Sequence, residues 1–232
     1  MRNGIHLASS VAASLLRGAS GRRVGKPGQR PDQALLLFDF ESCPFCRKAR
    51  EALSILDLSV DVRPCPKRGQ RFRGALLERG GKEQFPYLVD PNRGEELYES
   101  DAIVDYLFRH YGSTTAPRSL KGALPLVSGS LASLVRGQAG TFAEPSRAPV
   151  EPLALWSFEA SPYCRLVRER LCTLELPYRL HNVARGSAAR ADLRERAGKV
   201  QVPYLEDPNT GAHLFESADI LRYLEATYAA PT

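Results

Sequence analysis

A chain of 232 residues is long enough for one large domain or two small ones, and 43% hydrophobic with 25% charged residues is typical of a globular protein. No run approaches the roughly 18 consecutive apolar residues that a membrane-spanning helix needs. The net charge of +6 resides in residues 1–31, which hold six basic side chains and no acid. We therefore expect no folded basic face for nucleic-acid binding.

Residues 1–34 precede the first predicted strand and form a leader. A basic N-terminus that is rich in Gly, Ser and Arg and lacks acids is typical of an organelle transit peptide. However, residues 14–18 (SLLRG) recur in similar form as residues 133–137 (SLVRG), in the middle of the chain, where no transit peptide can lie. The recurrence favours an amphipathic helix in each place over organelle targeting by residues 1–31.

An internal repeat sets the domain organisation. Residues 35–58 align without a gap on residues 153–176, with 12 of 24 positions identical. Residues 80–111 align on residues 197–228, with 17 of 32 positions identical. Unrelated segments share far fewer residues, so the chain contains two copies of one unit.

The first copy predicts the element order βαβ, helix, ββα. Residues 35–40 form an apolar run typical of a buried strand, a helix follows from Pro44 to about Leu56, and residues 60–62 form a second strand. A basic stretch with a weak helix comes next. Residues 87–89 and 96–98 then flank the turn sequence DPNRG, and Ser100 caps a last helix. We expect a parallel, right-handed first crossover and an antiparallel closing hairpin.

The second copy follows the same course. We therefore expect an α/β protein with tandem domains at residues 35–112 and 153–229, which pack against each other within the chain. Residues 113–152 would form a linker with its own amphipathic helix.

The most informative motif is Cys43-Pro44-Phe45-Cys46, which follows a strand and begins a helix. The amides and the dipole of a helix N-terminus stabilise an anion, so we expect a thiolate at Cys43, with added positive charge from Arg47 and Lys48. Cys46 lies one helical turn further on. It can attack a mixed disulfide on Cys43 and release the substrate.

The other cysteines point to a reducing compartment. The chain has five cysteines, an odd number without the spacing of a secreted disulfide framework, so the cytoplasm or an organelle stroma or matrix is the expected location. The alternatives for Cys43 and Cys46 are half a zinc site or two inert core cysteines. No second pair completes a zinc site, and we expect no metal. Cys65 and Cys172 are interpreted as structural.

Three segments of each copy carry a family resemblance. Residues 40–46 (FESCPFC) resemble the active-site segment of glutaredoxins. Residues 84–88 (QFPYL) and 98–103 (YESDAI) resemble the N-terminal domain of glutathione transferases. The resemblance covers nearly all of residues 35–111 and 153–228, and it implies a thioredoxin-like fold that binds glutathione. The helical C-terminal domain of glutathione transferases does not fit in about 40 residues between the copies or after the second.

The resemblance implies roles in the first copy. Pro86 matches a cis-proline beside the active site, and the backbone of Phe85 would pair with glutathione as an added strand. Glu99 and Ser100 match the pair that holds the γ-glutamyl end. The implied glutathione-binding residues are Phe45, Lys82, Gln84, Phe85, Pro86, Glu99 and Ser100. The alternatives are a plain turn proline, a plain helix cap and a solvated lysine.

The second copy has serine where Cys43 stands, so it lacks the dithiol. The positions that match a glutathione site there are Ser161, Tyr163, Gln201, Val202, Pro203, Glu216 and Ser217. This copy would bind glutathione without further chemistry, or would activate the glutathione thiol through Ser161 as serine-type transferases do. The alternative is a degenerate copy retained for packing.

Together these features predict a glutathione-dependent, glutaredoxin-like thiol–disulfide oxidoreductase. Cys43 would be the nucleophile, Cys46 the resolving thiol, and glutathione the cofactor, with a protein disulfide of unknown identity as substrate. One alternative is a non-catalytic tandem module that binds glutathione or a protein. Another is an iron–sulfur carrier with Cys43 and glutathione as ligands.

Overall fold

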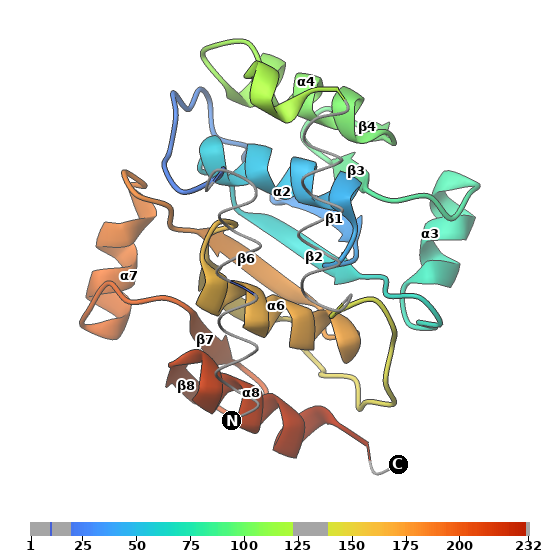
Figure 1. Cartoon of the computed structure of the whole chain (residues 1–232), viewed down its shortest axis with the longest axis vertical. Helices are drawn as coiled ribbons and strands as arrows, with labels where there is room; N and C mark the ends of the chain where they lie inside the picture. The colour runs from blue at the N-terminus through green and yellow to red at the C-terminus, as the bar shows by residue number, and fades with distance from the viewer. Residues whose placement is uncertain (1–9, 11–19, 123–138, 231–232) are drawn as a thin grey trace.

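The structure is a computed structural model that describes residues 10, 20–122 and 139–230. Both copies have the predicted element order (Figure 1). The elements of the first copy are β1 (Leu35–Asp39), α2 (Pro44–Ile55), β2 (Val60–Pro64), α3 (Arg73–Gly80), β3 (Tyr87–Asp90), β4 (Glu95–Leu97) and α4 (Ser100–Tyr111), followed by the 3₁₀ helix η1 (Arg118–Leu120). Those of the second copy are β5 (Leu153–Ser157), α6 (Pro162–Thr173), β6 (Tyr178–Asn182), α7 (Ala189–Ala197), β7 (Tyr204–Asp207), β8 (Ala212–Phe215) and α8 (Ser217–Tyr228).

All eight of these strands belong to one sheet, in the order β4-β3-β1-β2-β6-β5-β7-β8. Within the first copy, β1 and β2 are parallel and the β3–β4 hairpin is antiparallel, as predicted, and the second copy has the same pairings. The copies join where β2 pairs antiparallel with β6, with Asp61 opposite Arg179 at the centre of the register. The two predicted domains therefore share a continuous sheet.

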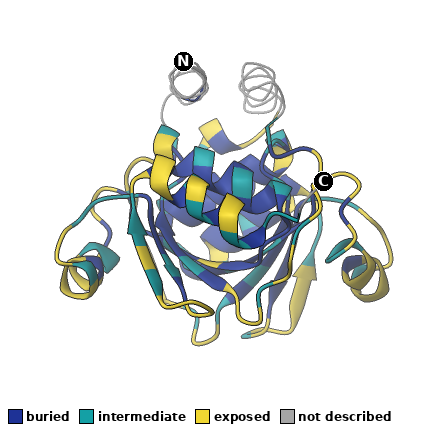
Figure 2. Ribbon diagram, turned by 90° about the horizontal axis from the view of Figure 1, so that it is seen from below, coloured by how far each residue is buried: buried dark blue, intermediate teal, exposed yellow. Residues whose placement is uncertain are grey.

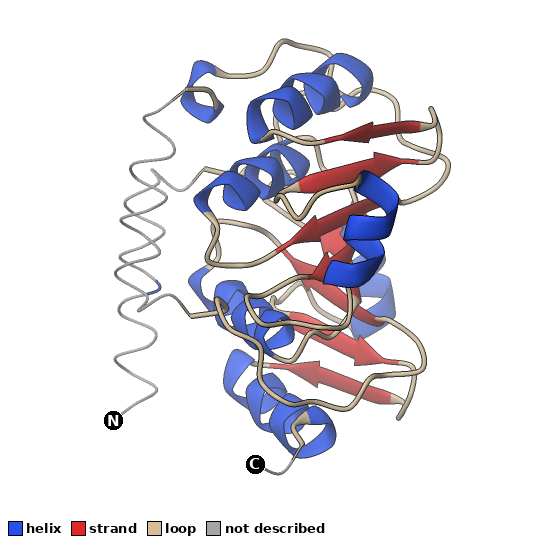
Figure 3. Cartoon of the chain, turned by 90° about the vertical axis from the view of Figure 1, so that its right-hand side faces the viewer, coloured by secondary structure: helices blue, strands red, loops and turns tan. Residues whose placement is uncertain are grey.

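Helices cover the two faces of the sheet unequally. The four helices α2, α4, α6 and α8 lie on one face, and the shorter α3 and α7 lie on the other (Figures 1 and 3). Strand alternation explains the layers: Leu35 and Leu37 of β1 face the four-helix side, whereas Phe38 packs with Leu76 of α3 on the other. The main core runs through both copies without interruption, and buried residues concentrate between the helices and the sheet (Figure 2).

A buried network of charges lies between α2 and α6. Arg168 Nη2 lies 3.0 Å from Glu41 Oε1 and 3.0 Å from Glu159 Oε2. Arg50 lies 3.1 Å from Glu159 through Nε and 3.4 Å from Glu41 through Nη2. Each glutamate is thus shared by one arginine from each copy, and all four side chains are at most 3% exposed. We call these four residues the seam network.

The segments that precede β1 and β5 cross to the opposite copy. Val24 N–H donates to Arg185 O, and Arg185 N–H donates to Arg22 O, both at 2.9 Å. In the other direction, Lys67 N–H donates to Thr141 O at 2.6 Å. Each copy is therefore bound by the arm that leads into the other.

The predicted amphipathic helices of the leader and the linker lie largely outside the described residues. Ser10 is described: it is fully buried, its Oγ donates to Pro162 O at 2.8 Å, and its carbonyl accepts from Arg165 at 3.1 Å. Among the described residues, no helix is long and apolar enough to cross a membrane, and no separate helical domain is present.

Loss of one seam arginine is expected to destabilise the fold strongly. In Arg168→Met, Glu41 and Glu159 lose one of their two closest buried counter-charges and keep Arg50, with Arg47 at 3.8 Å from Glu159, so we expect the free energy of unfolding to fall by about 3–5 kcal/mol. Arg222→Met removes an arginine whose partner Asp219 is solvent-exposed, and should cost about 0.5 kcal/mol or less. Urea unfolding of both variants checks this, and equal losses would contradict a structural role for the seam network.

Candidate active site

Cys43 is the N-cap of α2, immediately beyond the loop that follows β1. Its φ of −72° and ψ of 121° are extended, and Pro44 occupies the first helical position, where its missing N–H costs nothing. The Cys43 Sγ accepts a hydrogen bond from Cys46 N–H at 3.3 Å. The predicted motif therefore places a thiol at the positive end of a helix, as expected.

The two thiols have opposite electrostatic environments. Burial alone raises the pKa of Cys43, but hydrogen bonds from the Cys46 side chain and from the Cys46 and Phe45 N–H groups, with the charge on Arg50, outweigh burial and hold this pKa below its ordinary value. Burial and the neighbouring Cys43 raise the pKa of Cys46 well above its ordinary value. Cys43 is thus suited to attack, and Cys46 stays protonated until it is needed.

The cation that assists Cys43 is Arg50, not Arg47 or Lys48 as the sequence led us to expect. Lys48 pairs with Asp101 of α4, and the nearest carboxylate to Arg47 is that of Glu159, at 3.8 Å. Arg50 is fully enclosed and pairs through Nη1 with Asp39, while its Nη2 donates to Glu41 O at 3.0 Å. Sequence reasoning missed Arg50, although its recurrence as Arg168 was a usable signal.

The three motifs of the first copy converge at one end of the sheet. The ring of Phe85, which precedes the cis-proline Pro86, meets Phe40 edge-on at 5.7 Å between centroids. Phe40 O in turn accepts a hydrogen bond from Cys43 N–H at 3.1 Å. The Lys48–Asp101 ion pair connects α2 to the first turn of α4, where Ser100 lies.

Glu99 and Ser100 form the start of α4. Glu99 has a φ of 65°, in the left-handed region that costs free energy for a residue other than glycine, and Glu216 repeats this with 63°. The Glu99 side chain makes no capping hydrogen bond to α4, which leaves the first amides of this helix available to an anion. The Glu99 carboxylate accepts a hydrogen bond from Gln84, which joins two of the predicted glutathione-binding residues.

Of two further residues predicted to bind glutathione, Phe45 is available to a ligand and Lys82 is engaged elsewhere. Phe45 is 44% exposed beside the cysteines, as a contact with a ligand requires. Lys82 instead holds its ammonium 4.4 Å from the centroid of the Tyr98 ring, and Lys199 does the same over Phe215 at 4.2 Å. A cation–π contact thus occupies Lys82 in the structure.

The second copy reproduces this arrangement around Ser161. Ser161 has the same φ and ψ as Cys43 and accepts a hydrogen bond from Cys164 N–H at 3.2 Å. Tyr163 is 46% exposed, as Phe45 is in the first copy. The Val202–Pro203 bond is cis, Gln201 donates to Glu216, and the Glu216 side chain makes no capping hydrogen bond to α8.

Cys65 and Cys172 lack the environment of a reactive thiol. Burial raises the pKa of Cys65 and of Cys172 well above the ordinary value, and the carboxylate of Asp39 adds to both shifts. All five cysteines are free thiols. The described residues contain no group of three or more metal-ligating side chains.

Comparison with protein families finds one match, twice in the chain. A model described as the N-terminal domain of glutathione S-transferase matches residues 37–115 and 155–232, which together are more than half of the sequence. Searches of curated proteins and of solved structures found no match. The family match agrees with the predicted thioredoxin-like α/β fold in tandem.

The pKa of Cys43 can be measured directly. On a Cys46→Ser background, we expect the rate of alkylation by iodoacetamide to rise with a midpoint below the ordinary thiol value of about 8.5. A variant that also carries Cys43→Ser gives the background from the buried cysteines. A midpoint at or above pH 8.5 would show that the α2 N-terminus and Arg50 do not stabilise the thiolate.

Proposed function

Because the chain belongs to the glutathione S-transferase N-terminal domain family, we propose that it is a glutathione-dependent thiol–disulfide oxidoreductase of the glutaredoxin type. The observation that carries the proposal is the split between the two thiols at the α2 N-terminus, where the pKa of Cys43 is lowered and that of Cys46 is raised. A glutathione transferase that only conjugates electrophiles has no use for such a pair.

The proposed reaction reduces a mixed disulfide between a protein and glutathione. The Cys43 thiolate attacks the glutathionyl sulfur, the disulfide bond between that sulfur and the protein sulfur breaks, and the protein leaves as a thiolate that takes up a proton. Cys46 loses its proton and attacks the Cys43 sulfur, which releases reduced glutathione and leaves a Cys43–Cys46 disulfide. Two further molecules of glutathione reduce this disulfide and leave as oxidised glutathione.

The residues around Cys43 fit the parts of glutathione. The open amides of the α4 N-terminus and the hydroxyl of Ser100 suit the γ-glutamyl carboxylate, and Glu99 suits the adjacent ammonium. The backbone of Phe85 would pair with the cysteinyl part, and Phe45 would cover the ligand from the other side. Gln84 would orient Glu99, to which it already donates a hydrogen bond.

We propose that the second copy binds glutathione and does not carry out the thiol exchange. It retains the cis-proline, the Gln201–Glu216 hydrogen bond and an uncapped helix at Ser217. A serine hydroxyl is not ionised under conditions in which a cysteine thiol is, so Ser161 cannot replace Cys43 as the nucleophile. The chain would then have two glutathione sites and one redox centre.

Turnover should require Cys43, and it should not require Cys65. In a coupled assay with glutathione, glutathione reductase and a glutathionylated peptide, we expect Cys43→Ser to abolish turnover. Cys46→Ser should retain activity through direct attack of glutathione on the Cys43 mixed disulfide. Cys65→Ser removes a buried thiol outside the motif and serves as the control. Undiminished turnover in Cys43→Ser would refute the proposal.

Calorimetry can count the glutathione sites. A hydrogen bond to a charged group contributes about 1.5–3 kcal/mol, so Glu99→Ala and Glu216→Ala should each weaken one of two sites by about tenfold or more. Turnover should fall only in Glu99→Ala, because only the first copy carries Cys43. If Glu216→Ala changes neither stoichiometry nor affinity, the second copy is a structural partner and not a binding site.

A further inference from the structure

The mixed disulfide of the proposed reaction has a glutathione half and a protein half. Strand β1, which leads to Cys43, lies between β3 on one side and β2 on the other. Residues 84–86, which would contact glutathione, lead into β3, and Ser100 follows β4. Because glutathione would occupy the β3 side of the thiol, the protein half is left with the β2 side.

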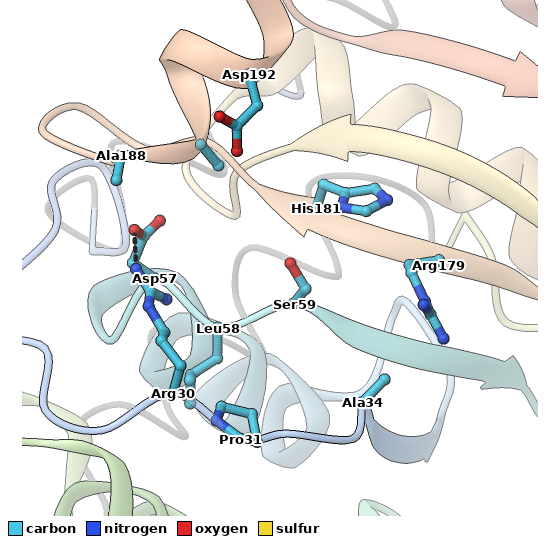
Figure 4. Close-up of a pocket in the computed structure, with 11 residues that line it drawn as sticks. Arg30, Pro31, Ala34, Asp57, Leu58, Ser59, Arg179, His181, Ala188 and Asp192 are labelled. Carbon is cyan, nitrogen blue, oxygen red and sulfur yellow. Dashed lines mark hydrogen bonds and ion pairs between the residues drawn. The ribbon is translucent and has the colours of Figure 1, made fainter.

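A hollow of about 370 Å³ at the junction of the copies is at the wrong end of the strands to receive the protein half (Figure 4). Leu58 and Ser59 in its wall directly precede β2, whereas Cys43 follows the end of β1. Since β1 and β2 are parallel, the hollow and the thiol lie at opposite ends of these strands. A surface for the protein half has to lie where β1 and β2 end.

The arm that leads into the second copy lies at that end, beside the residue that precedes Cys43. The hydroxyl groups of Ser42 and Thr141 share a hydrogen bond of 2.6 Å. Next along the arm, Phe142 forms a parallel β-bridge with Lys67 of the loop after β2. Backbone hydrogen bonds of 2.6 and 2.9 Å flank this bridge. The arm and the loop are therefore held next to the thiol on its β2 side.

Phe142 and two residues of this loop form an exposed surface. Phe142 is 47% exposed, and Arg68 Cζ lies 5.1 Å from the centroid of its ring. Lys67 and Arg68 are both exposed, and neither has an ion-pair partner among the described residues. The carboxylate of Glu175 is buried and accepts hydrogen bonds from two amides further along the loop instead. We call Lys67, Arg68 and Phe142 the platform, and it carries two unpaired positive charges.

Arg68 has a backbone conformation that is unfavourable for arginine. Its φ is 64°, in the left-handed region. In the second copy the same bridge joins Arg185 to Arg23, and the residue that follows it is Gly186, with a φ of 89°. Glycine adopts this conformation without the steric cost, so the loop itself does not require an arginine. Strain of this kind is concentrated at sites where the side chain has a function.

The exposed ring and the strained arginine occur only in the copy that has the nucleophile. At their positions the second copy has Arg23 and Gly186, and it has Ser161 in place of Cys43. The backbone pairing of arm and loop is the same in both copies, so packing does not explain these exchanges. A contact with the substrate of the first copy does explain them.

We propose, in an inference that rests on the proposed function, that the platform binds the protein half of the mixed disulfide and selects cysteines with an acidic residue nearby. A guanidinium stacked on a ring keeps its N–H groups free for a carboxylate, and Lys67 adds a second charge. The exposed part of the Phe142 ring offers an apolar contact. Phe142 is one residue beyond the contact of the arm with Ser42, a distance that about four residues of extended chain cover at about 3.3 Å each.

The test compares two glutathionylated peptides as substrates of the full chain, in the assay coupled to glutathione reductase. The peptides are identical except that the four residues on each side of the cysteine include glutamates in one and lysines in the other. A third substrate, the mixed disulfide of glutathione and 2-mercaptoethanol, has no peptide half. We expect the kcat/KM of wild type for the glutamate peptide to exceed that for the lysine peptide about tenfold or more.

Arg68→Gly gives the loop the residue that the second copy has. We expect this variant to lose about fivefold or more in kcat/KM for the glutamate peptide, mainly through KM, and to keep the kcat/KM of wild type for the small mixed disulfide. Its melting temperature should not fall, because glycine suits the φ of 64°. Arg194→Gln removes an equal charge from an exposed position on α7 and should change none of these values.

Equal kcat/KM values of wild type for the two peptides would overturn the proposal, and so would an undiminished preference in Arg68→Gly. If wild type turns over the small mixed disulfide in these cases, the chemistry at Cys43 stands and only the platform is refuted. If wild type does not turn over the small mixed disulfide, the proposed function fails, and the platform fails with it.

Discussion

The guanidinium of Arg50 meets Asp39, Glu41 and Glu159 in the interior, and both halves of the molecule depend on these contacts. Toward the active site, its charge opposes the burial that would otherwise raise the pKa of Cys43. Toward the second copy, it shares Glu159 with Arg168. Burial raises the pKa of Glu159, but the charges on Arg168, Arg50 and Arg47 lower it to about 2, so the carboxylate stays ionised and holds the arginines in place. The geometry of the thiol site is therefore connected to the packing of the copies.

Neither copy could satisfy these charges alone. Without the second copy, Arg50 and Glu41 would lose Glu159 and Arg168, and an unpaired buried charge costs several kcal/mol. The edge of β2 would also lose its hydrogen bonds to β6 and present an open strand. The crossed arms add to this dependence, because the loop after β2 pairs with the segment at Thr141 and the loop after β6 with Arg22. The tandem arrangement is thus a requirement of the fold and not a simple pair of independent domains.

The sequence predicted the elements of each copy because their signals are local: an apolar run at residues 35–40, Pro44 at a helix start, the turn sequence at residues 90–94. The joined sheet could not be predicted in this way, because β2 and β6 carry no pattern that distinguishes a central pair from an edge. The choice of Arg47 and Lys48 over Arg50 was wrong for a related reason. Arg47 and Lys48 were favoured because they are close to Cys43 in sequence. The distance of a basic side chain from the Cys43 thiol depends instead on the helix face from which it projects and on the carboxylate that it pairs with. From the sequence alone, a charged residue on an amphipathic helix is expected to be solvent-exposed, and only the packing of the other copy buries it.

The two copies also serve as references for each other. Ser161 and Cys43 share φ, ψ and the hydrogen bond from the residue three positions on, so the exchange of oxygen for sulfur leaves the scaffold unchanged. The difference between the copies at this point is therefore chemical, in the ease with which the group ionises. Because the backbone at positions 43 and 161 is the same, this difference can be assigned to the exchanged side chain.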